Sequence, residues 1–115
     1  MIFWVDGGFA GGRAYGSYTS EDGASLNHFQ LPNCHTNNEA EYGALHALLT
    51  DGPLHDAEDE IRTDSQLVVG HLTKGWKVKD SLKPFVLRAF QLLAAAGNPR
   101  LVQVPREEIF ERLGH

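Results

Sequence analysis

Cysteine is almost absent from this chain, in which Cys34 is the single one among 115 residues. A lone thiol cannot close an internal disulfide, so the fold must depend on a buried hydrophobic core, and a reducing cytoplasm is the expected compartment. The length is that of one ordinary domain and is enough to bury such a core without disulfides or metals. No repeat, low-complexity run or linker divides the sequence. We therefore predict a single domain over residues 1–115.

Long hydrophobic runs are absent as well. The N-terminal segment MIFWV is apolar for five residues and then meets Asp6. That run is too short for a signal peptide or a membrane-spanning helix. It predicts a buried strand instead, and we expect no membrane partner. No feature of the sequence sets the oligomeric state, and a monomer is our expectation.

Positive charge is scarce, because 10 Lys and Arg residues stand against 15 Asp and Glu residues, for a net charge of −5. Affinity for a polyanion comes mainly from Lys and Arg, so any contact with nucleic acid must use a local basic patch or metal ions. One such patch surrounds Trp76 and consists of Lys74, Lys77, Lys79 and Lys83. This segment could contact phosphates and stack its tryptophan on a sugar or base. It could equally be a loop whose tryptophan fills the core while the lysines stay in solvent.

The periodicity of the remaining residues predicts a mixed sheet with helices packed on it. Four glycines, at positions 7, 8, 11 and 12, predict a turn after the first strand. The period then changes from two residues to that of a helix. Strands are predicted at residues 1–7, 13–19, 24–31, 60–64 and 100–104, and helices at residues 37–50, 65–73, 81–96 and 107–113. Three hairpin strands followed by strand–helix alternation indicate an α/β fold with a five-stranded sheet.

Two glutamates, Glu39 and Glu41, open the first predicted helix and point to different sides of it. Glu39 follows Thr36 by three residues, which is the capping-box pattern, so its carboxylate should return to the Thr36 amide. Glu41 instead begins the apolar stripe Ala44, Leu45 and Leu48. A carboxylate at the start of a core-facing stripe loses hydration and needs a cation. Glu41 is therefore the candidate for chemistry and Glu39 the one for helix stability.

Two aspartates could share the site with Glu41. Asp6 lies at the exit of the first strand, and Asp64 ends the fourth strand where Ser65 starts a helix. Each has an ordinary alternative, since Asp6 could belong to a turn and Asp64 could cap the helix. Three carboxylates that converge from separate elements would repel one another unless a divalent cation joined them, and Mg²⁺ is the default for oxygen ligands.

Three short motifs contain these acids and occur in order along the chain: Asp6-Gly7-Gly8, Thr36-Asn37-Asn38 with Glu41 three residues later, and Thr63-Asp64-Ser65-Gln66. With them, nearly the whole chain resembles the ribonuclease H family, type I. The compact form, without a long basic insertion between the middle helices, is similar to the archaeal and small bacterial branch. The resemblance implies a ribonuclease H-like fold and cleavage of the RNA strand of RNA–DNA hybrids by two Mg²⁺ ions, with Mn²⁺ as a substitute.

The resemblance also implies roles for individual residues. Asp6, Glu41 and Asp64 would bind the metal ions and so be catalytic. Asn37, Asn38 and Gln66 occupy positions that read ribose 2′-hydroxyls in the family, a group that both donates and accepts hydrogen bonds. A helix cap is the ordinary alternative for Asn37. Trp76 and Lys77 are further candidates for contact with the hybrid.

The chain departs from the family in its last helix. The family places an asparagine and a fourth acid there, within a pattern like V-P-R-E-x-N-x-x-A-D. Residues 104–107 match, but Ile109 and Leu113 occupy the Asn and Asp positions. Glu111 is our candidate for the fourth catalytic and metal-binding acid, with Glu108 and Glu107 as alternatives. Each of them could also be a solvent-facing helix glutamate.

The missing aspartate and the acidic net charge leave a second hypothesis open. In it, the chain is a catalytically weakened ribonuclease H-like domain that binds nucleic acid or a protein partner, because one fold can host several functions. A pure binder, however, has no reason to keep three mutually repelling acids together. We therefore favour the enzyme.

Overall fold

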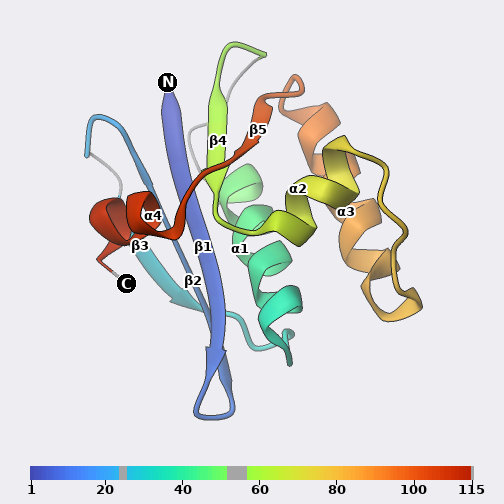
Figure 1. Cartoon of the computed structure of the whole chain (residues 1–115). Helices are drawn as coiled ribbons and strands as arrows, with labels where there is room; N and C mark the ends of the chain where they lie inside the picture. The colour runs from blue at the N-terminus through green and yellow to red at the C-terminus, as the bar shows by residue number, and fades with distance from the viewer. Residues whose placement is uncertain (24–25, 52–56, 115) are drawn as a thin grey trace.

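The computed structural model of the protein describes residues 1–23, 26–51 and 57–114. The predicted order of elements is confirmed (Figure 1), with a short 3₁₀ helix, η1, ahead of the third long helix. The strands are β1 (Ile2–Ala10), β2 (Arg13–Ser20), β3 (Asn27–Gln30), β4 (Glu60–Thr63) and β5 (Arg100–Gln103). The helices are α1 (Asn37–Asp51), α2 (Gln66–Thr73), η1 (Asp80–Leu82), α3 (Lys83–Ala95) and α4 (Arg106–Leu113).

The five strands form one mixed sheet in the order β3-β2-β1-β4-β5. β1 pairs antiparallel with β2, which pairs antiparallel with β3, whereas β4 runs parallel to both β1 and β5. The predicted α/β fold is thus confirmed. β1 lies at the centre, with the hairpin strands on one side of it and the strands of the strand–helix alternation on the other.

The first strand is longer than the sequence indicates. Gly7 and Gly8 do not form the predicted turn but continue β1, which pairs with β2 as far as Ala10. The turn is made by Gly11 and Gly12, whose φ angles are 60° and 77°. Gly7 is a glycine for a different reason, because a Cβ atom there would lie 2.1 Å from the carbonyl oxygen of Ala40. The start of α1 therefore packs directly on the backbone of β1.

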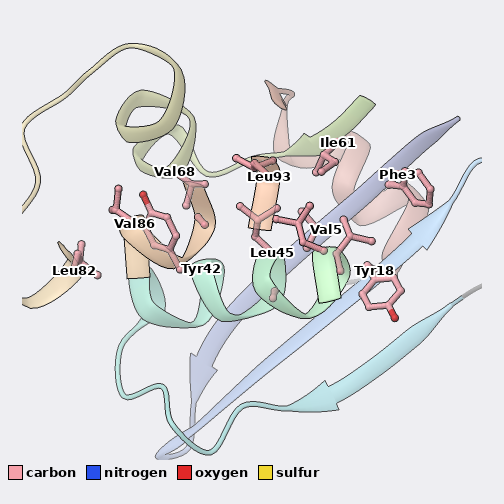
Figure 2. Packing of buried hydrophobic residues seen from close by; sticks show 14 residues of the cluster. Phe3, Val5, Tyr18, Tyr42, Leu45, Ile61, Val68, Leu82, Val86 and Leu93 are labelled. Carbon is pink, nitrogen blue, oxygen red and sulfur yellow. The ribbon is translucent and has the colours of Figure 1, made fainter. Parts of the chain in front are cut away.

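The main hydrophobic core lies between the sheet and helices α1, α2 and α3. Phe3 and Val5 of β1 point into it, and it also contains the predicted apolar stripe of α1. Ala44, Leu45 and Leu48 of that stripe are at most 1% exposed. Figure 2 shows side chains from both layers meeting in this core, among them Phe3, Val5, Tyr18, Tyr42, Leu45, Ile61, Val68, Leu82, Val86 and Leu93.

The last helix covers the other face of the sheet, where α4 lies in front of β1 and opposite α1 (Figure 1). Trp4 points to this side and packs against Ile109 and Leu113. Its indole Nε1 donates a 2.8 Å hydrogen bond to Glu108, which also accepts one of 2.8 Å from Arg62. Both faces of β1 are thus covered at Trp4, as the buried-strand prediction requires.

Two predicted boundaries fall partly outside the described residues. The third strand was predicted from residue 24, and residues 24 and 25 are not among those described. Gly52 and Pro53, whose residue types predict the end of the first helix, likewise lie outside the described residues. Within the described part of the chain, no helix has the length and apolar character needed to span a membrane.

Candidate active site

The structure brings together the three acids that the sequence singled out. β4 runs parallel to β1 with Trp4 opposite Arg62, so Asp6 and Asp64, each two residues further along, come to the same edge of the sheet. The carboxylate oxygens of Asp6, Glu41 and Asp64 all lie within 4.8 Å of one another. Asp6 is buried at 5% exposure, and the other two are half-buried. Asp6 is therefore not a turn residue, and Asp64 is not a helix cap, because Ser65 caps α2.

The close packing of α1 on Gly7 delivers Glu41 to this group. Ala40 and Glu41 contribute the backbone atoms that a Cβ at position 7 would strike, at 2.1 and 2.8 Å. Asp6 directly precedes Gly7 on the same strand. The first turn of α1 and the middle of β1 are thus held at backbone contact, which places their two carboxylates side by side.

Glu39 has the structural role predicted for it, with one difference. Its amide donates a 3.1 Å hydrogen bond to the hydroxyl of Thr36, as a capping box requires. Its carboxylate accepts from the amide of His35 at 2.8 Å, one residue before the predicted Thr36 amide. The helix start is stabilised from both directions, and Glu39 is not a member of the carboxylate group.

Burial and mutual repulsion disfavour the ionised forms of two of the acids. Burial, with the Asp64 carboxylate adding to it, raises the pKa of Asp6 from its ordinary 3.8 to about 6. Burial also raises the pKa of Glu41 from 4.5 to about 7, while a hydrogen bond from Ser65 opposes the shift. Two unit charges 4.8 Å apart repel by about 3 kcal/mol at an effective dielectric constant of about 20. The three carboxylates therefore need positive charge beside them if all are to be ionised together.

Arg106 supplies part of that charge. Its guanidinium Nη1 lies 2.8 Å from Oδ2 of Asp64, and the Arg106 side chain remains 68% exposed. It also helps to line a hollow of about 500 Å³ beside Asp6 and Glu41, with Gly8, Phe9, Tyr15, Asn37 and Asn38 on its walls. One cation facing three carboxylates leaves the site with a surplus of negative charge.

The donor set fits a divalent cation of the hard type. All three side chains offer carboxylate oxygens, which are the ligands that Mg²⁺ and Mn²⁺ prefer. They come from three separate elements and meet beside an open hollow, so a bound ion would remain accessible to water and substrate. A shared cation would also offset the burial and the mutual repulsion that raise the two pKa values.

The chain resembles known proteins in sequence and in structure. No family model matches it. Over 73 residues it is 41% identical to a ribonuclease HI of Halobacterium salinarum, an alignment that covers 62% of this chain and 37% of that protein. The crystal structure of RNase H1 from Halobacterium salinarum NRC-1 is 31% identical, has a TM-score of 0.77, and is matched over 98% of this chain and 90% of the other. The chain belongs to the ribonuclease H1 family.

Two further ribonuclease H structures agree. LC11-RNase H1 in complex with an RNA/DNA hybrid has a TM-score of 0.80 and 30% identity, over 96% of this chain and 88% of that one. The N-terminal RNase H domain of rv2228c from Mycobacterium tuberculosis, solved as a fusion with maltose binding protein, has a TM-score of 0.78 and 30% identity, over 97% and 88%. The family predicted from the motifs is confirmed.

The residues that ribonuclease H1 motifs assign to 2′-hydroxyl recognition lie at or near the site. Asn37 and Asn38 are exposed and line the same hollow as Asp6 and Glu41. The side-chain oxygen of Asn37 accepts a 2.7 Å hydrogen bond from the Phe9 amide, so it ties α1 to β1 rather than capping its own helix. Gln66 is exposed at the first position of α2, two residues after Asp64. Their contact with a hybrid remains a prediction.

The basic segment around Trp76 fits neither of its two sequence interpretations fully. Trp76 does not fill the core, since 41% of it is exposed. One face of its ring rests on Gly70 of α2, where a Cβ atom would lie 2.1 Å from the ring. The Nζ of Lys74 lies 5.8 Å from the ring centroid, and Lys77 is exposed. One face of the indole thus packs on α2, and the rest of the ring is partly exposed beside Lys74 and Lys77. Its use in binding remains a prediction.

The last helix gives the ribonuclease H1 site no fourth carboxylate within the described residues. Glu111 is exposed on α4 and lies outside the carboxylate group. Glu108 is bonded to Trp4 and Arg62, which accounts for it structurally. Leu113, at the position of the family aspartate, is buried against Trp4. The metal-binding role of Glu111 remains a prediction that this geometry does not support.

Sequence reasoning missed two residues of the site, Arg106 and Ser65. Arg106 belongs to the matching stretch 104–107, and it begins α4 three residues after the end of β5, a strand that runs parallel to β4. The strand-end rule that singled out Asp64 would have found it, had the rule been applied to cations as well as acids. Ser65 was assigned only to a helix start, and its lowering effect on the pKa of Glu41 had no sequence signal.

Proposed function

We propose that the protein is a ribonuclease H that cleaves the RNA strand of RNA–DNA hybrids with two divalent metal ions, Mg²⁺ or Mn²⁺. The observation that carries the proposal is the group formed by Asp6, Glu41 and Asp64, three carboxylates within 4.8 Å in a chain of the ribonuclease H1 family. The chain spans only about 37% of the length of the curated relative that it matches, so activity, substrate and partner are stated here as proposals.

Asp6, Glu41 and Asp64 would hold the cations in this reaction. Cations bound there supply the positive charge that activates a water molecule and stabilises the leaving oxygen of a phosphodiester. The protein itself contributes rigidity, because β1, β4 and the capped start of α1 fix the three carboxylates. Burial keeps water from screening the carboxylates and so strengthens their attraction for a cation.

Arg106 would act on the substrate side of the site. Its side chain is mostly exposed, and the ion pair between Nη1 and Asp64 holds the guanidinium at the rim of the hollow. A guanidinium in this position can bind a phosphate through two N–H groups. We propose that it binds the backbone of the strand being cut.

The proposed preference for RNA depends on Asn37, Asn38 and Gln66. Amide side chains both donate and accept, as a ribose 2′-hydroxyl does, and deoxyribose offers them no such partner. Asn38 lies on the wall of the carboxylate hollow, where it would contact a strand that entered the hollow. Trp76 and Lys77 would contact the same duplex further from the cut, through stacking and phosphate contacts.

A catalytically weakened form that mainly binds nucleic acid or a protein partner is the second candidate. The position of Leu113 favours it, because a buried leucine stands where the family pattern has its fourth acid. Loss of that acid would slow the chemistry, whereas the other groups proposed to bind the hybrid would remain.

A cleavage assay separates the two candidates. The RNA and DNA strands of a hybrid carry different labels and are incubated with the protein and Mg²⁺ or Mn²⁺, in parallel with the Asp6→Asn variant. Metal-dependent cutting of the RNA strand alone, lost in Asp6→Asn, supports the ribonuclease. Retention of the hybrid in a gel-shift assay without cutting supports the binder.

A further inference from the structure

Glu108 joins the first turn of α4 to the two strands that lead to Asp6 and Asp64. Its carboxylate oxygen Oε2 accepts a 2.8 Å hydrogen bond from the indole Nε1 of Trp4 and another of 2.8 Å from Nη1 of Arg62. Trp4 belongs to β1 and Arg62 to β4, and the two are opposite each other in the parallel pair. A single carboxylate therefore ties α4 to both strands.

Arg106 makes a second contact between the same turn of the helix and the same segment of the chain. Asp64 lies two residues after Arg62, and its Oδ2 is 2.8 Å from Nη1 of Arg106. Arg106 and Glu108 are both in the first turn of α4. The start of α4 is thus bonded twice to the end of β4, by Glu108 at Arg62 and by Arg106 at Asp64.

The backbone at Arg106 lies between two anchored points. On the β5 side, the Val104 amide donates a 2.9 Å hydrogen bond to the carbonyl oxygen of Thr63. On the helix side, Pro105 occupies the N-cap position of α4, and no side chain of the described residues caps the helix there. The side chain of Glu108 supplies the anchor on this side. Without it, Arg106 would be tethered from β5 alone.

Apolar contacts keep α4 on the sheet but do not fix its first turn. Ile109 and Leu113 pack against Trp4. Hydrophobic contact is not directional, whereas a hydrogen bond restricts both the distance and the angle between its partners. Loss of the Glu108 carboxylate should therefore leave the helix packed on the sheet and release the Arg106 side chain from its position.

We propose that Glu108 is a positioning residue, which holds the guanidinium of Arg106 at Asp64 and so keeps it aimed at the strand to be cut. The inference rests on the proposed function, in which Arg106 binds the backbone of that strand. The Arg106 side chain is 68% exposed. A long, exposed side chain that must be ordered when the substrate arrives lowers affinity, and one that is already held in place avoids this loss.

The test measures the steady-state cleavage of a hybrid by Glu108→Ala and two further variants. Glu108→Gln keeps the length of the side chain and an oxygen that can accept a hydrogen bond from Trp4. Glu60→Gln is the matched control, because Glu60 accepts a 2.6 Å hydrogen bond from Nε of the same Arg62 but lies on β4 rather than on α4. Thermal unfolding reports the stability of each variant separately.

A second measurement needs no substrate. Crystal structures of the metal-free wild type and of Glu108→Ala compare the position of the Arg106 guanidinium. We expect it on Asp64 in the wild type and displaced from Asp64 in the variant, with α4 still packed on Trp4 in both.

We expect Glu108→Ala to raise KM for the hybrid about fivefold and to leave kcat within about twofold, which is the signature of lost binding. Glu108→Gln restores most of the wild-type KM. Glu60→Gln lowers the melting temperature and leaves KM within about twofold. In an Arg106→Gln background, Glu108→Ala causes no further rise in KM, because its effect passes through Arg106.

Three results would overturn the inference while a cleaving wild type upholds the proposed function. The first is a normal KM in Glu108→Ala, and the second is a rise in KM that persists undiminished beside Arg106→Gln. The third is a fall in kcat alone, which would place Glu108 in the chemical step. A wild type that cleaves no hybrid contradicts the proposed function instead, and the crystal structures then decide the positioning: a guanidinium that stays on Asp64 in Glu108→Ala overturns it.

Discussion

Replacement of Asp6 by asparagine should stabilise the metal-free protein at neutral pH, although it removes a residue of the proposed active site. The pKa of Asp6 is raised to about 6 from 3.8, so the folded protein holds this proton more tightly than the unfolded chain does. A raised carboxyl pKa makes the free energy of unfolding greatest below the ordinary pKa and lowers it as the pH rises through the folded value. A shift of about two units corresponds to about 3 kcal/mol.

The comparison uses urea unfolding in EDTA at pH 4 and at pH 8. Asparagine resembles the protonated form of Asp6, so the variant should gain about 2 kcal/mol relative to the wild type between these two pH values. The difference in free energy of unfolding between Asp6→Asn and the wild type is taken at each pH, so that the titration of most other groups cancels. Glu107→Gln, which removes an exposed acid, controls for the lost charge. An Asp6→Asn variant whose advantage is the same at both pH values would show that Asp6 is not held in a desolvated, repelling site.

Three further predictions test other parts of the structure. Glu39→Gln should lower the free energy of unfolding by about 1 kcal/mol and leave hybrid cleavage nearly unchanged. Glu41→Gln should abolish cleavage without lowering the free energy of unfolding. Equal loss of activity in both variants would refute the assignment of their roles. Gly7→Ala should reduce both the melting temperature and cleavage, because its Cβ would force α1 away from β1, and normal values of both would contradict the contact at 2.1 Å. Glu111→Gln and Glu107→Gln should cleave at equal rates, since neither acid lies in the carboxylate group, and a selective loss in Glu111→Gln would restore Glu111 as the fourth acid.

The sequence predicted the three acids because each has a pattern around it that local rules can interpret. Glu41 stands at the head of an apolar stripe, and Asp64 stands where a strand passes into a helix. Their convergence follows from the strand order of the sheet, in which β4 runs parallel to the central β1. These are local signals, and they hold because a buried sheet and its helices leave few arrangements open.

Contacts between distant segments could not be predicted in the same way. Gly7 looked like a turn residue, and only the packing of Ala40 on it explains why the strand continues. Arg106 and Asp64 are 42 residues apart, and the register of β5 on β4 brings them together. The last helix was judged by its glutamates, yet its place is set by Trp4, which binds Glu108 and packs on Leu113.

Anomalous diffraction from crystals soaked in Mn²⁺ tests the central claim most directly. The account predicts manganese within bonding distance of carboxylate oxygens of Asp6, Glu41 and Asp64, and loss of that signal in crystals of Asp6→Asn. Well-ordered crystals with no manganese at this position, and with the three carboxylates held by protein donors such as Arg106 at saturating Mn²⁺, would contradict it.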